Sequence, residues 1–272
     1  MDIKSKLRDF GGVNPPYAPP YSTGSLKWEK GKRSAVVRNL ELITRVEGRK
    51  IDELLECTPF DRVNERVAFR FLLSSEHYSP LPPIIAPEEE MFDLMVTVPV
   101  RFQGLLAFHH LYMYCSDTGG TSSGRELHGY SKKDCTHRFR ESIEGNIDGW
   151  VDRRKKRLAA FSFVPSASAV DLQLVDGEQQ PHGELHVRRF AHPSSPEPAY
   201  ADIIYRNFAP DYSAYQIGHA TMNLENLPFD PLKDLAPEIL AAHVSHTSNY
   251  GVTGEKREIL ARFLNPSGPS PL

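Results

Sequence analysis

The strand-rich stretch from Asp93 to Cys115 is the part of the sequence that decides the fold. It consists of DLMVTVPVRF at residues 93–102 and GLLAFHHLYMYC at residues 104–115, two runs rich in β-branched and aromatic side chains. Runs of this composition and length are typical of β-strands. The stretch therefore predicts two strands that follow each other closely along the chain.

Similar runs occur over most of the chain. Seven more segments have strand-like composition, and Gly, Pro or Asp bounds most of them. They are residues 34–46, 66–75, 157–166, 169–177, 184–192, 200–208 and 215–224. Residues 47–59 and 235–248 instead have apolar residues at helical spacing. Roughly nine strands with two or three helices, and no βαβ alternation, predict a mainly β (α+β) fold whose antiparallel or mixed sheet curls or closes.

The composition is that of an ordinary globular protein, with 40% hydrophobic residues and a formal net charge of −3. This charge gives no reason to expect nucleic acid or an anionic membrane as partner. The basic run at residues 153–157 has no interleaved aromatic residues and indicates a solvated loop or helix face. No segment approaches the roughly 18 apolar residues that span a bilayer. Three scattered cysteines are too few for a disulfide framework, so we expect a reducing, cytoplasmic location.

Three regions are expected along the chain. Residues 1–30 form a Pro-rich N-terminal arm, in which NPPYAPP at residues 14–20 cannot be helical. Residues 31–262 form a single domain, and residues 263–272 form a disordered tail.

The histidines and cysteines in the middle of the chain match no metal-binding motif. Their spacings differ from those of tight ligand pairs such as C-x-x-C or H-x-x-x-H. The residues concerned are His109, His110, Cys115, Cys135 and His137. No metal ion is therefore expected, and one ring of His109 and His110 should face the core while the other faces outward. G-x-S-x-G and phosphate-binding loops are absent, and DTGGTSSG at residues 117–124 indicates a connection between strands.

The segment GRELHGYSKKD, residues 124–134, contains a pair of lysines. A lysine becomes a nucleophile when its amine is neutral near pH 7, which requires burial in apolar surroundings, a neighbouring cation, or both. Lys132 follows a hydrophobic strand and lies near Tyr130, so burial is a reasonable expectation. The alternative is an exposed turn in which Lys132 and Lys133 have no chemical role. The residues alone leave both interpretations open.

GRELHGYSKK closely resembles the active-site motif of the acetoacetate decarboxylase superfamily, where Gly-Arg-Glu-Leu precedes Tyr-Pro-Lys-Lys. TVPVRFQG at residues 97–104 and YMY at residues 112–114 precede it with the family's spacing. DPLKDLAPEILAAHVSH at residues 230–246 is similar to a C-terminal stretch of the family. The resemblance covers roughly residues 35–250. It implies a β-rich fold built around a closed, cone-shaped barrel, usually found in homo-oligomers.

The resemblance implies roles for four residues near the predicted sheet. Lys132 matches the lysine that forms a Schiff base with a substrate ketone, and Lys133 matches its cationic neighbour. Asp93 lies where the family has a glutamate near that lysine. Arg38 lies within one residue of an arginine expected to contact the substrate carboxylate.

Other residues of the motif either match the family or depart from it. Arg125 and Glu126 keep an ion pair of the motif, with a structural role. Ser131 replaces a proline of the motif. Outside the motif, Arg70 stands where the decarboxylases carry a second glutamate. Arg70 therefore either binds another anionic group of the substrate or faces outward. His128 replaces a small residue, which suggests a general acid or base, or equally a structural hydrogen bond.

If the motif is extended, alternation places Tyr130 and His128 on the face of Lys132, while Lys133 points the other way. Tyr130 is then a substrate-binding residue, and burial affects the pKa of Lys132 more than Lys133 does.

The function that the resemblance implies is a Schiff-base lyase that needs no cofactor. An iminium on Lys132 would be an electron sink for decarboxylation of a β-keto acid. The alternatives are an aldolase-dehydratase or related carbon–carbon lyase on the same lysine, or a non-catalytic ligand-binding member of the family. The expected partners are a small keto acid or ketone and further copies of the chain, with no nucleic acid and no membrane.

Overall fold

A computed structural model describes residues 34–78, 90–166, 181, 183–192, 195–207, 214–247 and 256–264. The strands are β1 (Ser34–Arg45), β2 (Asp61–Arg62), β3 (Arg66–Tyr78), β4 (Met91–Phe102), β5 (Leu105–Cys115), β6 (Lys132–Asp134), β7 (Thr136–Glu141), β8 (Ile147–Arg153), β9 (Lys156–Pro165), β10 (Glu184–His192), β11 (Ser195–Asn207), β12 (Ala214–Leu224), β13 (Asn226–Leu227), β14 (Asp230–Pro231), β15 (Glu238–Thr247) and β16 (Lys256–Leu264). The helical elements are α3 (Gly48–Leu55), α4 (Thr118–Ser123), the π-helical turn η2 (Gly124–His128) and the 3₁₀ turn η3 (Lys233–Leu235).

One mixed sheet contains nearly all of these strands. Its order is β16-β11-β10-β5-β4-β3-β1-β15-β12-β9-β8-β7, with β2 beside β4 and β6 beside β5. Most neighbours are antiparallel, but β10 and β6 both pair in parallel with β5. The prediction of a mainly β fold with a mixed sheet is confirmed. No pairing joins the outer strands β16 and β7 within the described residues, so closure into a barrel stays a prediction.

The strand predictions agree with the structure over most of the sheet. Eight of the nine predicted segments correspond to β1, β3, β4, β5, β9, β10, β11 and β12, whereas residues 169–177 lie outside the described residues. The helix predicted within residues 47–59 is α3. The basic run at residues 153–157 lies at the hairpin between β8 and β9, where Arg153 pairs with Lys156. Only Arg154 and Lys155 form the turn, and Arg153 is mostly buried beside Asp230, so the prediction of a solvated loop or helix face agrees with the structure only in part.

One secondary-structure prediction is wrong. Residues 238–247, within the segment expected to be helical, form strand β15. This strand lies between β1 and β12 and is buried on both faces from Ala241 to Ser245, so it lacks the alternation that identifies a strand. DTGGTSSG lies between β5 and β6, as expected of a connection between strands, and it contains helix α4. Asp117 caps this helix by accepting a hydrogen bond from the Gly120 backbone amide.

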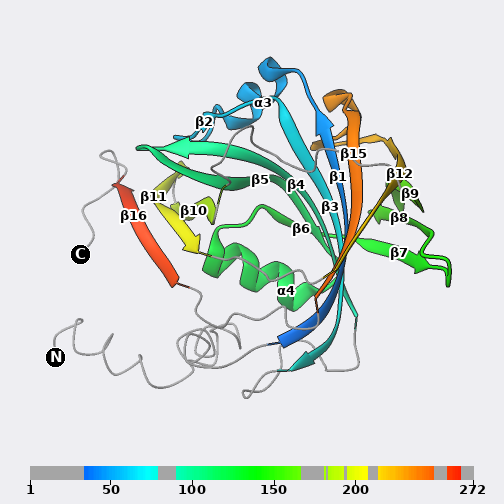
Figure 1. Ribbon diagram of the computed structural model, residues 1–272. Helices are drawn as coiled ribbons and strands as arrows, with labels where there is room; N and C mark the ends of the chain where they lie inside the picture. The colour runs from blue at the N-terminus through cyan, green and yellow to red at the C-terminus, as the bar shows by residue number, and fades with distance from the viewer. Residues whose placement is uncertain are drawn as a thin grey trace.

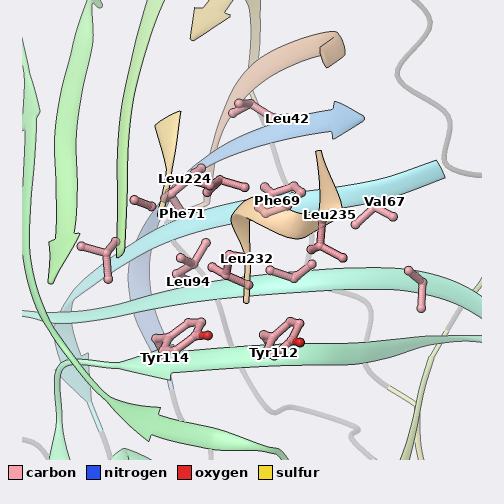
Figure 2. Close-up of a cluster of buried hydrophobic side chains, with 14 of the residues drawn as sticks. Leu42, Val67, Phe69, Phe71, Leu94, Tyr112, Tyr114, Leu224, Leu232 and Leu235 are labelled. Atoms are coloured by element: carbon pink, nitrogen blue, oxygen red, sulfur yellow. The ribbon is translucent and has the colours of Figure 1, made fainter. Parts of the chain in front are cut away.

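The two faces of the central strands carry different side chains. Leu40, Leu42, Phe69 and Phe71 belong to the large apolar core, which also includes Leu232 beside η3 (Figure 2). Each such side chain contributes about 1.5–3 kcal/mol by burial.

Because side chains alternate along a strand, the neighbours of these core residues point to the other face. There Val37, Leu72, Met95, Met113 and Tyr130 form a smaller cluster. Helix α4 lies on the concave side of the curved sheet, close to β6, which pairs with β5 (Figure 1). The concave face is therefore where the lysine-bearing segment meets the sheet.

No helix in the described ranges is long and apolar enough to cross a membrane. The division into arm, domain and tail, the homo-oligomeric state and the cytoplasmic location stay predictions.

Candidate active site

Lys132 is buried at the start of β6, where its side chain is 7% exposed. Parallel pairing places it beside Met113 of β5, and antiparallel pairing places Cys115 of β5 beside Asp93 of β4. Lys132 Nζ lies 2.9 Å from Asp93 Oδ1. Three adjacent strands therefore bring together the predicted nucleophile and the predicted carboxylate.

The charge of Asp93 decides the resting state of Lys132. Burial alone would lower the pKa of the amine, but the neighbouring Asp93 carboxylate outweighs burial and raises the pKa above its ordinary value. Cys115 lies close to both groups, and burial together with Asp93 raises the pKa of its thiol to about 12. The resting site is therefore an ammonium–carboxylate pair beside a neutral thiol. To act as a nucleophile, Lys132 would first have to lose this proton, and the Asp93 carboxylate is an acceptor within direct reach.

Gly124, the first residue of the motif, makes room for the lysine. A Cβ atom at this position would lie 2.8 Å from Lys132 Cδ and 3.3 Å from a ring carbon of Tyr130. The same contact shows that the side chains of Lys132 and Tyr130 are neighbours. Glycine is needed here because the helical turn passes directly over the lysine side chain.

Replacing Gly124 with alanine is expected to destabilise the protein and displace Lys132. Helix propensity alone favours alanine by about 1 kcal/mol, but the contact with Lys132 Cδ is too short for a methyl group, and overpacking of this kind costs about 1–3 kcal/mol. Thermal or urea denaturation measures the loss, and the rate of imine trapping measures the displacement. Ser122→Ala in the preceding turn is the control and should change stability by less than about 0.5 kcal/mol. Greater stability of Gly124→Ala would contradict the contact.

Lys133 lies on the opposite face of β6 from Lys132, as the alternation of strand side chains predicts. Its Nζ donates hydrogen bonds to the carbonyl of Phe229 at 2.9 Å and to Asp230 Oδ1 at 2.6 Å. The amine also lies 5.6 Å from the centre of the Tyr112 ring. Lys133 therefore links β6 to the segment that contains β14. Its expected influence on Lys132 stays a prediction.

The charge state of Lys133 depends on opposing neighbours. Burial and the positive charges of Arg153 and Arg154 lower the pKa of Lys133 to about 8. The fully buried Asp230 carboxylate, which also pairs with Arg153, opposes this shift by favouring the ammonium form. At 2.6 Å the carboxylate is the closer partner, so we take Lys133 to be protonated at neutral pH.

Tyr130 links the lysine to a buried polar network. Its hydroxyl donates to Glu184 Oε2 at 2.5 Å and accepts a hydrogen bond from Arg206. Arg206 also lies 3.2 Å from Glu184 Oε2. Burial alone would raise the pKa of Glu184, but Arg206 and two histidine neighbours hold it well below its ordinary value. Glu184 is therefore a carboxylate at neutral pH.

His128 lies beside Tyr130, although the segment is not extended there. Residues Gly124–His128 form the π-helical turn η2, and Gly129 has a positive φ of 74°. The His128 and Tyr130 rings stack with centroids 4.9 Å apart. A Cβ at Gly129 would lie 2.9 Å from the backbone nitrogen of Arg188, so the turn packs closely against β10. The predicted proximity of His128 to Tyr130 thus arises from stacking.

Arg70 faces inward and is paired with a carboxylate. Its Nε lies 2.9 Å from Glu41 Oε2, and its guanidinium lies 5.0 Å from the centre of the Phe108 ring. Burial alone would raise the pKa of Glu41, but Arg70, His243 and Asn39 hold it below its ordinary value of 4.5. Of the two orientations that the sequence left open for Arg70, the structure has the inward one.

Removing the Arg70 side chain is expected to destabilise the protein. Arg70→Met leaves Glu41 buried without its main counter-charge, which typically costs about 3–5 kcal/mol. The double variant Arg70→Met/Glu41→Gln should recover much of this loss. The lowered pKa of Glu41 also means that its stabilising effect is present above pH 4.5 and is lost as the pH falls through the folded-state value. Urea denaturation between pH 7 and pH 3 should therefore show that the free energy of unfolding falls less steeply with pH in the double variant than in the wild type. Equal slopes for the two proteins would contradict a stabilising Arg70–Glu41 ion pair.

The structure does not bring Arg38 to Lys132. The Arg38 side chain is 48% exposed and lies 3.3 Å from Glu141 of β7. It points to the face opposite the buried side chains of Val37 and Asn39. The contact with a substrate carboxylate that the resemblance implied for Arg38 is therefore not supported by its position.

The ion pair expected between Arg125 and Glu126 stays a prediction. Arg125 is exposed, and the side chain of Glu126 lies outside the described residues.

The expectation for the two adjacent histidines is wrong. His109 and His110 are both buried, because β5 is covered on both of its faces. His109 packs against Phe60 with ring centroids 5.0 Å apart. His110 Nδ1 and Thr97 Oγ1 share a hydrogen bond of 2.8 Å.

His110 also meets two side chains that sequence reasoning missed. Its Nε2 lies 3.3 Å from Glu184 Oε1, and the ring of His186 lies 5.0 Å from its own ring. Their spacing of two residues on a predicted strand is a signal that Glu184 and His186 share a face. No sequence signal connected them to His110.

Comparisons with known proteins agree with this geometry. A family model described as acetoacetate decarboxylase matches residues 15–259. Because the match covers most of the sequence, the chain belongs to the acetoacetate decarboxylase family. No curated protein sequence matches it.

Solved structures of the family share the fold. An acetoacetate decarboxylase structure superposes with a TM-score of 0.70 at 15% identity, covering 86% of this chain and 91% of that one. The acetoacetate decarboxylase of Legionella pneumophila has a TM-score of 0.66 at 12% identity, covering 85% and 88%. The enduracididine biosynthesis enzyme MppR has a TM-score of 0.67 at 15% identity, covering 92% and 98%. At these identities the likeness establishes the fold.

Proposed function

We propose that the protein is a cofactor-independent lyase that decarboxylates a β-keto acid through an iminium on Lys132. The observation that carries this proposal is the buried pair of Lys132 and Asp93, whose nitrogen and oxygen lie 2.9 Å apart. A lysine in this setting has a proton acceptor within direct reach, so it can become a neutral amine without contact with bulk water. Membership of the acetoacetate decarboxylase family supports the same chemistry.

Substrate binding would switch the pair to its reactive form. In the resting site the carboxylate holds Lys132 as an ammonium ion. A second anion that binds nearer to Asp93 than to Lys132 repels the carboxylate more strongly than it attracts the ammonium ion, because like charges in a buried site disfavour ionisation. The carboxylate of a keto acid is such an anion. Its arrival therefore favours transfer of the proton from Lys132 Nζ to Asp93, which leaves a neutral amine beside the ketone.

The remaining steps use the proton now held by Asp93. The amine attacks the ketone carbon, and Asp93 returns its proton to the carbinolamine oxygen, which leaves as water to give the iminium. The bond between the α-carbon and the carboxylate then breaks, CO₂ leaves, and the electron pair moves to the iminium nitrogen to form an enamine. Protonation of the enamine carbon and hydrolysis release the ketone and regenerate Lys132.

Other side chains of the concave face would bind the substrate. The Tyr130 ring packs beside the Lys132 side chain and would contact the carbon chain of the substrate. Arg70 would attract a further anionic group, in exchange for part of its contact with Glu41. His128, stacked on Tyr130, is the candidate for a second proton donor. Lys133 would act indirectly, by holding β6 in place through Asp230.

A second candidate is an aldolase-dehydratase or related carbon–carbon lyase that uses the same lysine. The observation that favours it is Arg70, an inward cation that suits a substrate with more than one anionic or polar group. The related MppR was solved with pyruvate, and also with the condensation product of pyruvate and imidazole 4-carboxaldehyde. An α-keto acid has no carboxylate β to the iminium carbon, so it would enter carbon–carbon bond formation or dehydration instead.

Reductive trapping combined with gas measurement tests both candidates. Borohydride added with acetoacetate should attach the substrate skeleton covalently to Lys132, located by peptide mass spectrometry. Headspace CO₂ release with a β-keto acid indicates decarboxylation, whereas an adduct with pyruvate and no CO₂ indicates the second candidate. The absence of an adduct with every keto acid and ketone tried would leave ligand binding without catalysis.

A further inference from the structure

Three buried side chains outside the lysine site form a compact cluster on β5 and β10. His110, Glu184 and His186 each offer one ligand atom, and these atoms lie within 4.8 Å of one another. His110 Nε2 is 3.3 Å from Glu184 Oε1, and His186 Nε2 is 3.7 Å from Glu184 Oε2. Two ligands around a tetrahedral Zn²⁺ ion are about 3.3 Å apart, given bonds of about 2.0–2.1 Å. The cluster therefore has nearly the dimensions of a metal site.

The histidine nitrogens are oriented for ligation. Without a metal ion, a proton on His110 Nε2 can be donated to Glu184 Oε1 at 3.3 Å. The other tautomer, in which Nδ1 donates its proton to Thr97 Oγ1 at 2.8 Å, frees the Nε2 lone pair for ligation. His186 is 1% exposed, and its Nε2 makes no hydrogen bond within the part of the chain that the structure describes. A buried ring nitrogen without such a bond costs stability unless another partner satisfies it. A metal ion between the three side chains is a partner of that kind.

We propose that His110, Glu184 and His186 bind a divalent first-row transition-metal ion such as Zn²⁺. Two neutral imidazoles and one carboxylate are a ligand set that holds zinc and leaves a coordination position open. The proposal does not depend on the chemistry of Lys132. The ion would lie next to the Tyr130 hydroxyl, which already contacts Glu184.

Arg206 sets a limit on the affinity of this site. Its guanidinium lies 3.2 Å from Glu184 Oε2 and repels a nearby cation. The other oxygen, Oε1, faces His110. Glu184 can therefore use Oε1 for the metal ion while Oε2 keeps Arg206 and Tyr130, an arrangement in which the arginine is an outer partner of the ligating carboxylate.

Metal binding by the full chain tests the proposal directly. Protein stripped with a chelator is dialysed against Zn²⁺, and the bound metal is measured by mass spectrometry. We expect one equivalent per chain, with at least a tenfold loss of affinity in His186→Asn and in Glu184→Gln. His219→Ala, which removes an exposed histidine of β12, is the matched control and should keep the full equivalent. Lys132→Met should also keep it, which separates this site from the proposed lyase chemistry.

A second measurement covers variants that fold poorly. Co²⁺ added to the stripped wild-type protein should give the visible absorption of a four-coordinate site with nitrogen ligands, and the metal should raise the melting temperature of the wild-type protein but not of His186→Asn. No bound equivalent in the wild-type protein would overturn the proposal. Equal binding by wild type, His186→Asn and Glu184→Gln would also overturn it, since the metal would then lie elsewhere.

Discussion

Substitution of Lys132 by methionine is expected to abolish imine formation and to lower kcat on the order of 10⁴-fold or more, the usual scale for loss of a nucleophile. Methionine has a similar length but cannot attack a carbonyl. Its introduction also leaves Asp93 buried without a counter-charge, which typically costs about 3–5 kcal/mol. Borohydride trapping, steady-state kinetics and urea denaturation measure the three effects.

Two variants separate chemistry from stability in this experiment. Lys132→Met/Asp93→Asn removes both charges, so it should recover much of the lost stability while remaining inactive. Lys133→Met should still form the borohydride adduct, because Lys133 Nζ is held by Asp230 on the other face of β6. The opposite pattern, an adduct with Lys132→Met and none with Lys133→Met, would make Lys133 the nucleophile.

Replacing Asp93 with asparagine is expected to move the pH dependence of trapping to lower pH while reducing kcat about 10²–10⁴-fold. The Asp93 carboxylate raises the pKa of Lys132 against the effect of burial. Without the carboxylate burial becomes the dominant influence, so the pKa of Lys132 falls and the neutral amine forms at lower pH. The chemical step is nevertheless slower, because asparagine cannot accept the lysine proton or return it to the leaving water.

The conservative change Asp93→Glu is the control for Asp93→Asn. It keeps the carboxylate and matches the residue type expected from the family, so it should retain more activity than asparagine and a pH profile close to that of the wild type. A profile for Asp93→Asn that is unchanged, or moved to higher pH, would show that Asp93 does not govern the protonation of Lys132.

The alternation of side chains along a strand explains why the faces of Lys132 and Lys133 could be predicted and why the position of Arg38 could not. Alternation placed Lys132 and Lys133 on opposite faces of β6, and the contact with Asp230 agrees. By the same rule, a residue whose alignment with the family is uncertain by one position cannot be assigned to a face, because a shift of one residue moves a side chain to the other face. Arg38 is such a case: the arginine was expected within one residue of that position, and its side chain points away from Lys132.

Contacts between distant strands could not be predicted from the sequence. The lysine segment and Asp93 came together through a motif resemblance, whereas His110 meets Glu184 only because β5 pairs in parallel with β10, 74 residues away. Strand β15 was mistaken for a helix for a related reason. Both of its faces are covered by neighbours that no local pattern reveals, so its apolar residues follow no period of two.

The close approach of Gly129 to Arg188 has a consequence for protein engineering. The backbone of the lysine segment touches the backbone of β10, so neither piece has a shape that is independent of the other. A chimera that received residues 124–134 from another member of the family would also need the matching β10. The unit of exchange between relatives is therefore the loop together with its supporting strand, although 49 residues of sequence lie between Asp134 and Glu184.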